Sequence, residues 1–216
     1  MEIIYIDSIE KKDHEASRRA AEALSRGEAI ILPAGTIYGL SCLIDHEPGF
    51  QKIYSLKKRS GHMPLIILFS EPGQLSGLIL KPRPEANKLM EHFWFSQKPQ
   101  ALTLVMTKHP KLAGYVTAGK ENIALRFAPP GFLHQVIGAA GPITSTSATL
   151  SGTKTYPDRL EKIPQSIRKG TDLAIASKSS LPGIESTIVD ISGPAPSLIR
   201  EGIVGYEQVC SIWGRD

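Results

Sequence analysis

The stretch NIALRFAPPGFLHQVIGAAGPITSTS, residues 122–147, holds one helix pattern between two strand patterns. Residues 122–129 fit a strand, although Arg126 interrupts a run that should otherwise be apolar. Prolines open residues 130–140 as a helix, and residues 142–147 continue as a strand that runs into a loop. A strand, a helix and a second strand in succession are typical of a mixed α/β fold.

Outward from this stretch, helix and strand patterns alternate in the first half of the chain, and strands dominate the second half. Helices are expected at 13–28, 47–59, 84–95 and in part at 156–170, and strands at 2–6, 29–33, 38–44, 64–69, 101–106, 173–177, 185–191 and 196–202. Asp13 is the expected N-cap of the first helix, and Gly27 its stop. We therefore predict one domain, residues 1–216, with a twisted mixed sheet flanked by helices and no additional C-terminal domain.

Composition sets broad limits on the function. Of 216 residues, 41% are hydrophobic and 21% charged, which is ordinary globular usage. The longest apolar runs, such as LIILF, are too short to span a bilayer, and no signal peptide is recognisable, so a cytoplasmic protein is expected. Cys42 and Cys210 lie far apart and suggest neither a disulfide framework nor a metal motif. The net charge of +4 suits an anionic partner without requiring one.

Several common site types are absent from the sequence. It contains no HExxH motif, Cys/His cluster or EF-hand loop, so no protein-held metal is predicted. GxGxxG does not follow the first strand, and GxSxG does not occur. GYVTAGKE, residues 114–121, approaches a P-loop, but it ends in Glu121 instead of Ser or Thr and leads into a strand. We interpret it as a turn.

Isolated cations and hydroxyl groups form the remaining pattern. PITSTSATLSG, residues 142–152, holds six hydroxyl side chains and no charge. Each cation alone has an ordinary explanation: the run 57–59 could be a solvated helix end, and Arg126 a structural ion pair. Together, cations entering from several strand ends beside hydroxyl donors suit a polyphosphate and a carboxylate. No nucleophile with an obvious base is present, so positioning and charge neutralisation would carry any catalysis.

Seven motifs in order give the chain a wider resemblance. LPAGTIYGL, LKKRSGHMPLIIL, ALTLVM, NIALRFAPP, TSTSATLSG, ESTIVD and LIREG follow the landmarks of the YrdC-like family of threonylcarbamoyl-AMP synthases, which serve the threonylcarbamoyladenosine modification of transfer RNA. The resemblance covers about residues 10–205. It implies a YrdC-like domain with a concave basic cleft. It also implies a nucleotidyl transfer in which L-threonine, bicarbonate or CO2, and ATP give threonylcarbamoyl-AMP and pyrophosphate.

The resemblance also implies cofactors, partners and site residues. Mg²⁺ is expected with ATP, held by phosphates and water rather than by a protein cage. Double-stranded RNA or tRNA, and the downstream tRNA threonylcarbamoyl transferase proteins, are further expected partners, and no membrane is expected. By matching position, Lys57 and Arg59 would be catalytic. Threonine would contact Thr36, Leu68, Arg126, Ser145 and Ser186, and ATP would contact Arg59, Met63, Asn122, Ser147, Thr155 and Arg200.

The chain departs from the family pattern at several of these positions. Thr149 replaces the usual Asn, and Met63 and Leu68 lack polar groups. The turn PAGT also lacks the polar residue that usually precedes Thr36. Two alternatives therefore stay open beside the synthase: an RNA-binding module on the same fold, and a divergent nucleotide-using paralogue. No aromatic residue interleaves the basic run 57–59, which gives base stacking poor support.

Overall fold

The computed structural model describes residues 1–214 and contains a ten-stranded sheet in the order β1-β8-β2-β3-β7-β4-β6-β5-β9-β10. The strands are β1 Glu2–Ile6, β2 Ile30–Pro33, β3 Tyr38–Leu43, β4 Ile66–Phe69, β5 Leu102–Thr107, β6 Asn122–Phe127, β7 Ile143–Ser147, β8 Leu173–Ser177, β9 Thr187–Asp190 and β10 Ser197–Arg200. Parallel and antiparallel neighbours both occur, so the predicted mixed sheet is confirmed.

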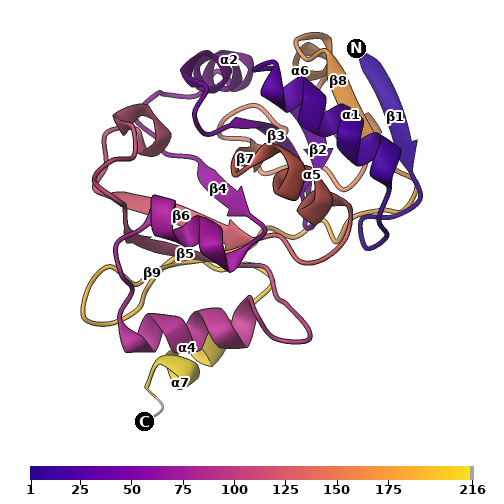
Figure 1. The fold of residues 1–216 in the computed structure, drawn as a ribbon. Coiled ribbons are helices and arrows are strands. Elements are labelled where there is room, and N and C mark those ends of the chain that lie inside the picture. Colours follow the sequence, from indigo (N-terminus) through magenta and orange to yellow (C-terminus); the bar gives the residue numbers. More distant parts are fainter. Residues whose placement is uncertain (215–216) are drawn as a thin grey trace.

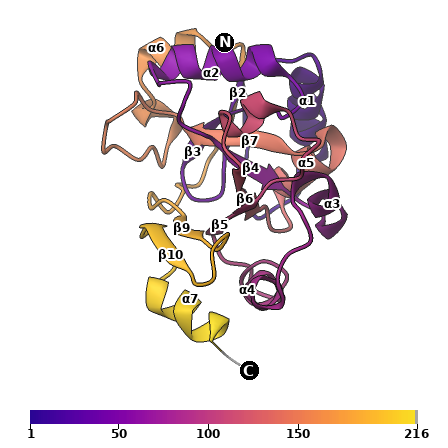
Figure 2. The ribbon, with the colours of Figure 1, turned by 90° about the vertical axis from the view of Figure 1, so that its left-hand side faces the viewer.

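Helices cover the sheet (Figures 1 and 2). They are α1 His14–Ser25, α2 Glu47–Lys57, α3 Leu75–Leu78, α4 Pro84–Phe93, α5 Phe132–Ala140, α6 Gln165–Lys169 and α7 Tyr206–Trp213, with short 3₁₀ turns at Pro72–Gln74, Gly114–Thr117 and Leu160–Lys162. Figure 1 shows α1 beside α5, and α4 beside α7 near the C-terminus. The flanking helices agree with the predicted fold class. The domain limits and the wider concave basic cleft stay predictions.

Local signals explain where the first two helices begin and end. Asp13 has extended backbone angles and accepts a hydrogen bond from the backbone N–H of Ala16 at 3.0 Å, as its predicted N-cap role requires. Gly27, with φ of 82°, follows the end of α1. Helix α2 ends at Lys57 rather than at 59 because Lys58 adopts a left-handed conformation with φ of 50°. The chain therefore leaves the helix before Arg59.

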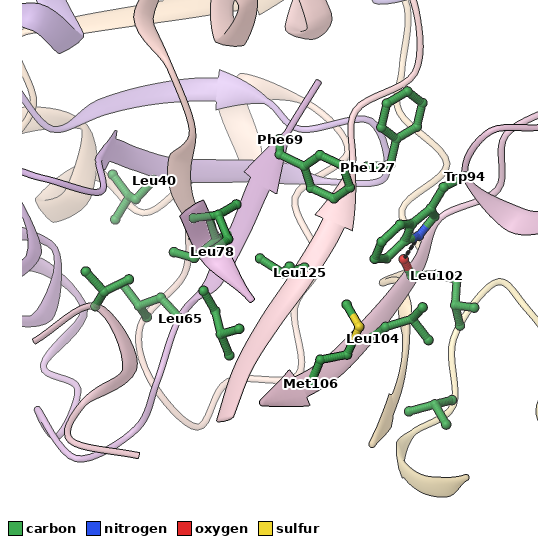
Figure 3. Close-up of a cluster of buried hydrophobic side chains, with 14 of the residues drawn as sticks. Leu40, Leu65, Phe69, Leu78, Trp94, Leu102, Leu104, Met106, Leu125 and Phe127 are labelled. Atoms are coloured by element: carbon green, nitrogen blue, oxygen red, sulfur yellow. Dashed lines mark hydrogen bonds between the residues drawn. The ribbon is translucent and has the colours of Figure 1, made fainter. Parts of the chain in front are cut away.

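Two apolar clusters pack on the two faces of the sheet. Successive side chains of β2 point to opposite faces of the sheet, so Ile31 belongs to the first cluster, and Ile30 and Leu32 belong to the second. Around Ile30 the second cluster is made mainly by α1 and α5. Figure 3 shows the first cluster, in which the indole N–H of Trp94 donates to the carbonyl of Leu102 at 2.8 Å. This satisfies a polar group that is fully buried.

The central strands determine which side chains meet. Strand β7 lies between β3 and β4, antiparallel to both, and β6 lies between β4 and β5. In this register Ser145 pairs with Ser41 and Ile66. Arg126 of β6 pairs with Leu68 on one side and with Thr103 on the other. Segments distant in the sequence thus bring hydroxyl and guanidinium groups to adjacent strands.

Candidate active site

A cavity of about 150 Å³ opens beside these central strands. Its wall is formed by the turn after β2, by the segment after α2, and by strands β4, β6, β7, β9 and β10 with their flanking residues. The residues predicted from the sequence that line it are Thr36, Arg59, Leu68, Arg126, Ser145, Ser147, Ser186 and Arg200. The structure therefore brings most of the predicted site residues together, although their roles toward ligands stay predictions.

Arg126 lines the cavity and is buried. Its guanidinium donates to the hydroxyl of Thr36 at 3.1 Å and to the carbonyl of Ala34. Gly35, in a left-handed conformation with φ of 87°, allows the turn that presents these two groups. Burial, and then the nearby charge of Arg200, lower the pKa of Arg126 to about 10, so the side chain stays cationic at neutral pH. A buried guanidinium with unused donors suits a carboxylate.

Lys57 stands behind the wall rather than in it. Its side chain is 1% exposed, and its ammonium donates to the carbonyl of Ser147, to the carbonyl of Thr149 at 2.7 Å and to the Ser147 hydroxyl at 3.3 Å. Burial, and then the charge of Arg59, lower the pKa of Lys57 to about 8. In this arrangement the ammonium fixes the turn that follows β7. A direct catalytic role for Lys57 stays a prediction.

Ser147 and Arg59 form the side of the cavity near α2. The hydroxyls of Ser147 and Thr149 lie 3.1 Å apart and share a hydrogen bond, and the carbonyl of Thr149 accepts a hydrogen bond from the Lys57 ammonium. Arg59 donates from Nη2 to the carbonyl of Pro64 at 3.3 Å and from Nε to the carbonyl of Met63 at 3.5 Å, and burial lowers the pKa of its guanidinium. Its remaining N–H groups are available to an anion at the cavity.

Arg200 and Ser186 form the opposite side. Arg200 donates to the Ser186 carbonyl from Nε at 3.2 Å and from Nη2 at 2.8 Å, and Nη1 lies 2.6 Å from a carboxylate oxygen of Glu185. The Ser186 hydroxyl shares a hydrogen bond of 2.8 Å with Thr103. Sequence reasoning missed Glu185 and Thr103. Glu185 directly precedes Ser186, but only the pairing of β9 with β10 brings it to Arg200.

Three predicted nucleotide contacts lie outside the cavity wall. Met63 and Thr155 are exposed, and Asn122 is half-buried at the start of β6, where its amide donates to the Ser192 hydroxyl at 3.0 Å. A second, more apolar cavity of about 380 Å³ shares Thr36 and Arg126 with the first. The smaller cavity holds the cations and hydroxyls, so we place the candidate site there.

The chemistry of the described residues bears on metals and membranes. Residues 1–214 contain no group of three or more His, Cys, Asp or Glu side chains arranged to hold a metal ion. Apart from Glu185, which is paired with Arg200, the charged and hydroxyl side chains of the cavity wall are guanidinium and hydroxyl groups, which fit the phosphates of a magnesium nucleotide rather than its cation.

Among residues 1–214, no helix combines the length and apolar character needed to cross a bilayer.

The family model described as Sua5/YciO/YrdC, telomere recombination, matches residues 22–202. The chain belongs to the Sua5/YciO/YrdC family. A relative in this family, the threonylcarbamoyl-AMP synthase of Bacillus subtilis, is 32% identical over 211 residues, which are 96% of this chain and 59% of the relative.

Solved structures of the family share the fold. Pyrococcus abyssi Sua5, in a crystal structure complexed with L-threonine, superposes with a TM-score of 0.89 at 27% identity, covering 99% of this chain and 61% of that one. Escherichia coli YciO superposes with a TM-score of 0.83 at 21% identity, covering 94% of this chain and 97% of that one. The chain thus spans about 60% of the length of the Bacillus relative and of Pyrococcus Sua5.

Proposed function

We propose that this Sua5/YciO/YrdC chain is an L-threonylcarbamoyladenylate synthase that converts L-threonine, bicarbonate or CO2, and ATP to threonylcarbamoyl-AMP and pyrophosphate. The observation that carries the proposal is the convergence of Arg59, Arg126 and Arg200 with several hydroxyls on one cavity. A cavity of about 150 Å³ lies below the roughly 300–1,000 Å³ typical of drug-sized ligands. An amino acid would fill it, and the nucleotide would extend across its mouth.

The geometry suggests how each side of the cavity would act. The threonine carboxylate would bind Arg126, whose buried guanidinium is held at a fixed angle by Thr36. The hydroxyls of Ser145 and Ser186 would complete the amino-acid site. Because Ser145 lies on β7 and Ser186 directly precedes β9, strands of one sheet would hold the amine of threonine in one orientation relative to the nucleotide.

The chemical step needs no covalent enzyme intermediate. The threonine amine captures CO2 as a carbamate and loses a proton, and a carbamate oxygen then attacks the α-phosphorus of ATP. The bond from the α-phosphorus to the bridging oxygen breaks, and pyrophosphate leaves with the electron pair. Arg59 and Arg200, which both line the cavity, would neutralise phosphate charge. Mg²⁺ bound to the triphosphate would add to that neutralisation.

The reaction places the chain before an enzyme that transfers threonylcarbamoyl to tRNA, and we propose that both act in the cytoplasm. Direct RNA binding has less support, because Lys57, one cation of the basic run 57–59, is buried and donates to backbone carbonyls. That leaves Lys58 and Arg59 from the run, and Arg59 faces the cavity.

The deciding assay measures pyrophosphate release from ATP, Mg²⁺ and bicarbonate with and without L-threonine. Threonine-dependent release is expected, whereas threonine-independent turnover would favour a different nucleotide-using enzyme. Within the active protein, Arg126→Ala should raise the KM for threonine far more than that for ATP, and Arg59→Ala should do the reverse. Equal losses for both substrates in both variants would contradict the assigned roles.

A further inference from the structure

Glu185 brings a carboxylate to a wall that otherwise carries guanidinium and hydroxyl groups. Among residues 1–214 it is the one acidic side chain that lines the cavity. Its ion pair with Arg200 joins Oε1 and Nη1 at 2.6 Å, with side chains 16% and 31% exposed. Every other ion pair between described residues is more open to solvent. A shielded, charged hydrogen bond of this kind is stronger than an ordinary surface pair.

Arg200 needs such a partner because its backbone is weakly held. It ends β10, an edge strand that has a neighbour, β9, on one side only. The β9–β10 register also shifts between Leu198 and Arg200, an irregularity of the kind that re-aims a side chain. The direction of the guanidinium is therefore set by its own contacts with Ser186 and Glu185 rather than by a regular ladder.

Those contacts are themselves fixed by the surrounding structure. Thr103, fully buried on β5, holds the Ser186 hydroxyl at 2.8 Å, and Arg200 Nη2 lies 3.3 Å from the same hydroxyl. The Glu185 carbonyl accepts the N–H of Ile203 at 3.0 Å. A Cβ at Gly202 would lie 2.2 Å from that carbonyl, so the two segments pack too closely for Glu185 to shift easily.

We propose that Glu185 is a positioning residue that holds the Arg200 guanidinium at the cavity for the phosphates of ATP. The role rests on the proposed synthase function. In the empty protein the carboxylate offsets the repulsion between Arg200 and the buried Arg126, which lie close enough for the charge of one to lower the pKa of the other. An arginine already ordered before binding loses less conformational entropy when the nucleotide arrives.

The test compares Glu185→Gln with the parent protein by steady-state kinetics and by calorimetric ATP binding without threonine. The Gln variant should weaken ATP binding and raise the KM for ATP about tenfold, equivalent to ~1.4 kcal/mol, with the KM for threonine little changed. Glu185→Asp should restore part of the loss because the charge is kept. Glu28→Gln, which removes the carboxylate of a surface pair with Arg26, is the matched control and should behave as the parent.

A double-mutant cycle separates positioning from a general effect on folding. If Glu185 acts through Arg200, Glu185→Gln should cause no further loss of ATP affinity in an Arg200→Ala background. Unchanged or tighter ATP binding in Glu185→Gln, or a full additional loss in the double variant, would overturn the inference. A parent protein that binds ATP but shows no threonine-dependent pyrophosphate release would instead refute the proposed function. The ATP-binding data would still show whether Glu185 positions Arg200.

Discussion

Replacing Lys57 with Met should change how the stability of the protein depends on pH. In the folded protein the pKa of Lys57 is lowered from 10.5 to about 8, first by burial and then by the charge of Arg59. The unfolded chain therefore binds more protons than the native state between about pH 8 and 10.5, so this group makes the free energy of unfolding rise with pH across that window. Below pH 8 the native state carries the full cost of a buried charge.

The size of the effect follows from the two pKa values. Each pKa unit corresponds to ~1.4 kcal/mol. When the pH is raised from 7.5 to 10, the free energy of unfolding of the parent protein should therefore increase by roughly 2 kcal/mol relative to that of Lys57→Met. The hydrogen bonds that the variant loses to the carbonyls of Ser147 and Thr149 add an offset that is nearly the same at both pH values.

Urea unfolding of both proteins at pH 7.5 and pH 10 measures this double difference. Lys52→Met, on the same helix at a position where the lysine is only partly buried, is the matched control and should show no comparable change. A free-energy difference between the parent and Lys57→Met that stays constant across these pH values would refute the argument. It would mean that the carbonyl contacts hold the ammonium charged well above pH 8.

Three further substitutions test other parts of the structure. Gly131→Ala should lower the unfolding temperature, with a loss of roughly 1–3 kcal/mol, because φ is 149° and a Cβ would lie 2.4 Å from the Ile9 carbonyl. Gly39→Ala would place a Cβ 2.5 Å from the Ser145 hydroxyl, so steady-state kinetics should show the KM for threonine rising about tenfold and that for ATP much less. Trp94→Phe leaves a buried carbonyl without its N–H partner and should cost about 1–3 kcal/mol in urea unfolding.

The sequence patterns predicted the fold well where periodicity and turn residues agree. Both strands and the helix of the stretch 122–147 are present, each with bounds within a few residues of those expected. Helix α7 was missed, although Tyr206, Val209 and Trp213 recur at helical spacing. It begins at Gly205 without a side-chain cap and runs for only 8 residues, so the usual signals of a helix start are weak.

The candidate site was predictable where a polar residue breaks an apolar pattern. Arg126 stood out because it interrupts a buried strand, and the structure places it in the cavity wall. Lys57 was harder to place, because a cation at the end of a helix usually faces solvent. Its spacing from Phe50 and Ile53 puts it on the buried face of α2, which is the signal that could have identified it.

The two missed contacts share a physical cause. Glu185 reaches the cavity wall, and Thr103 reaches the Ser186 hydroxyl, only through pairings between strands distant in the sequence. No local pattern distinguishes these two residues from ordinary residues in or beside strands. Strand β9 lies between β5 and β10, so its register alone brings Thr103, Ser186 and Arg200 together. A substitution that shifted β9 along β5 would therefore disturb the hydroxyl and the guanidinium of this wall together, while Arg126 and Thr36, held by β6 and the turn after β2, would keep their contact.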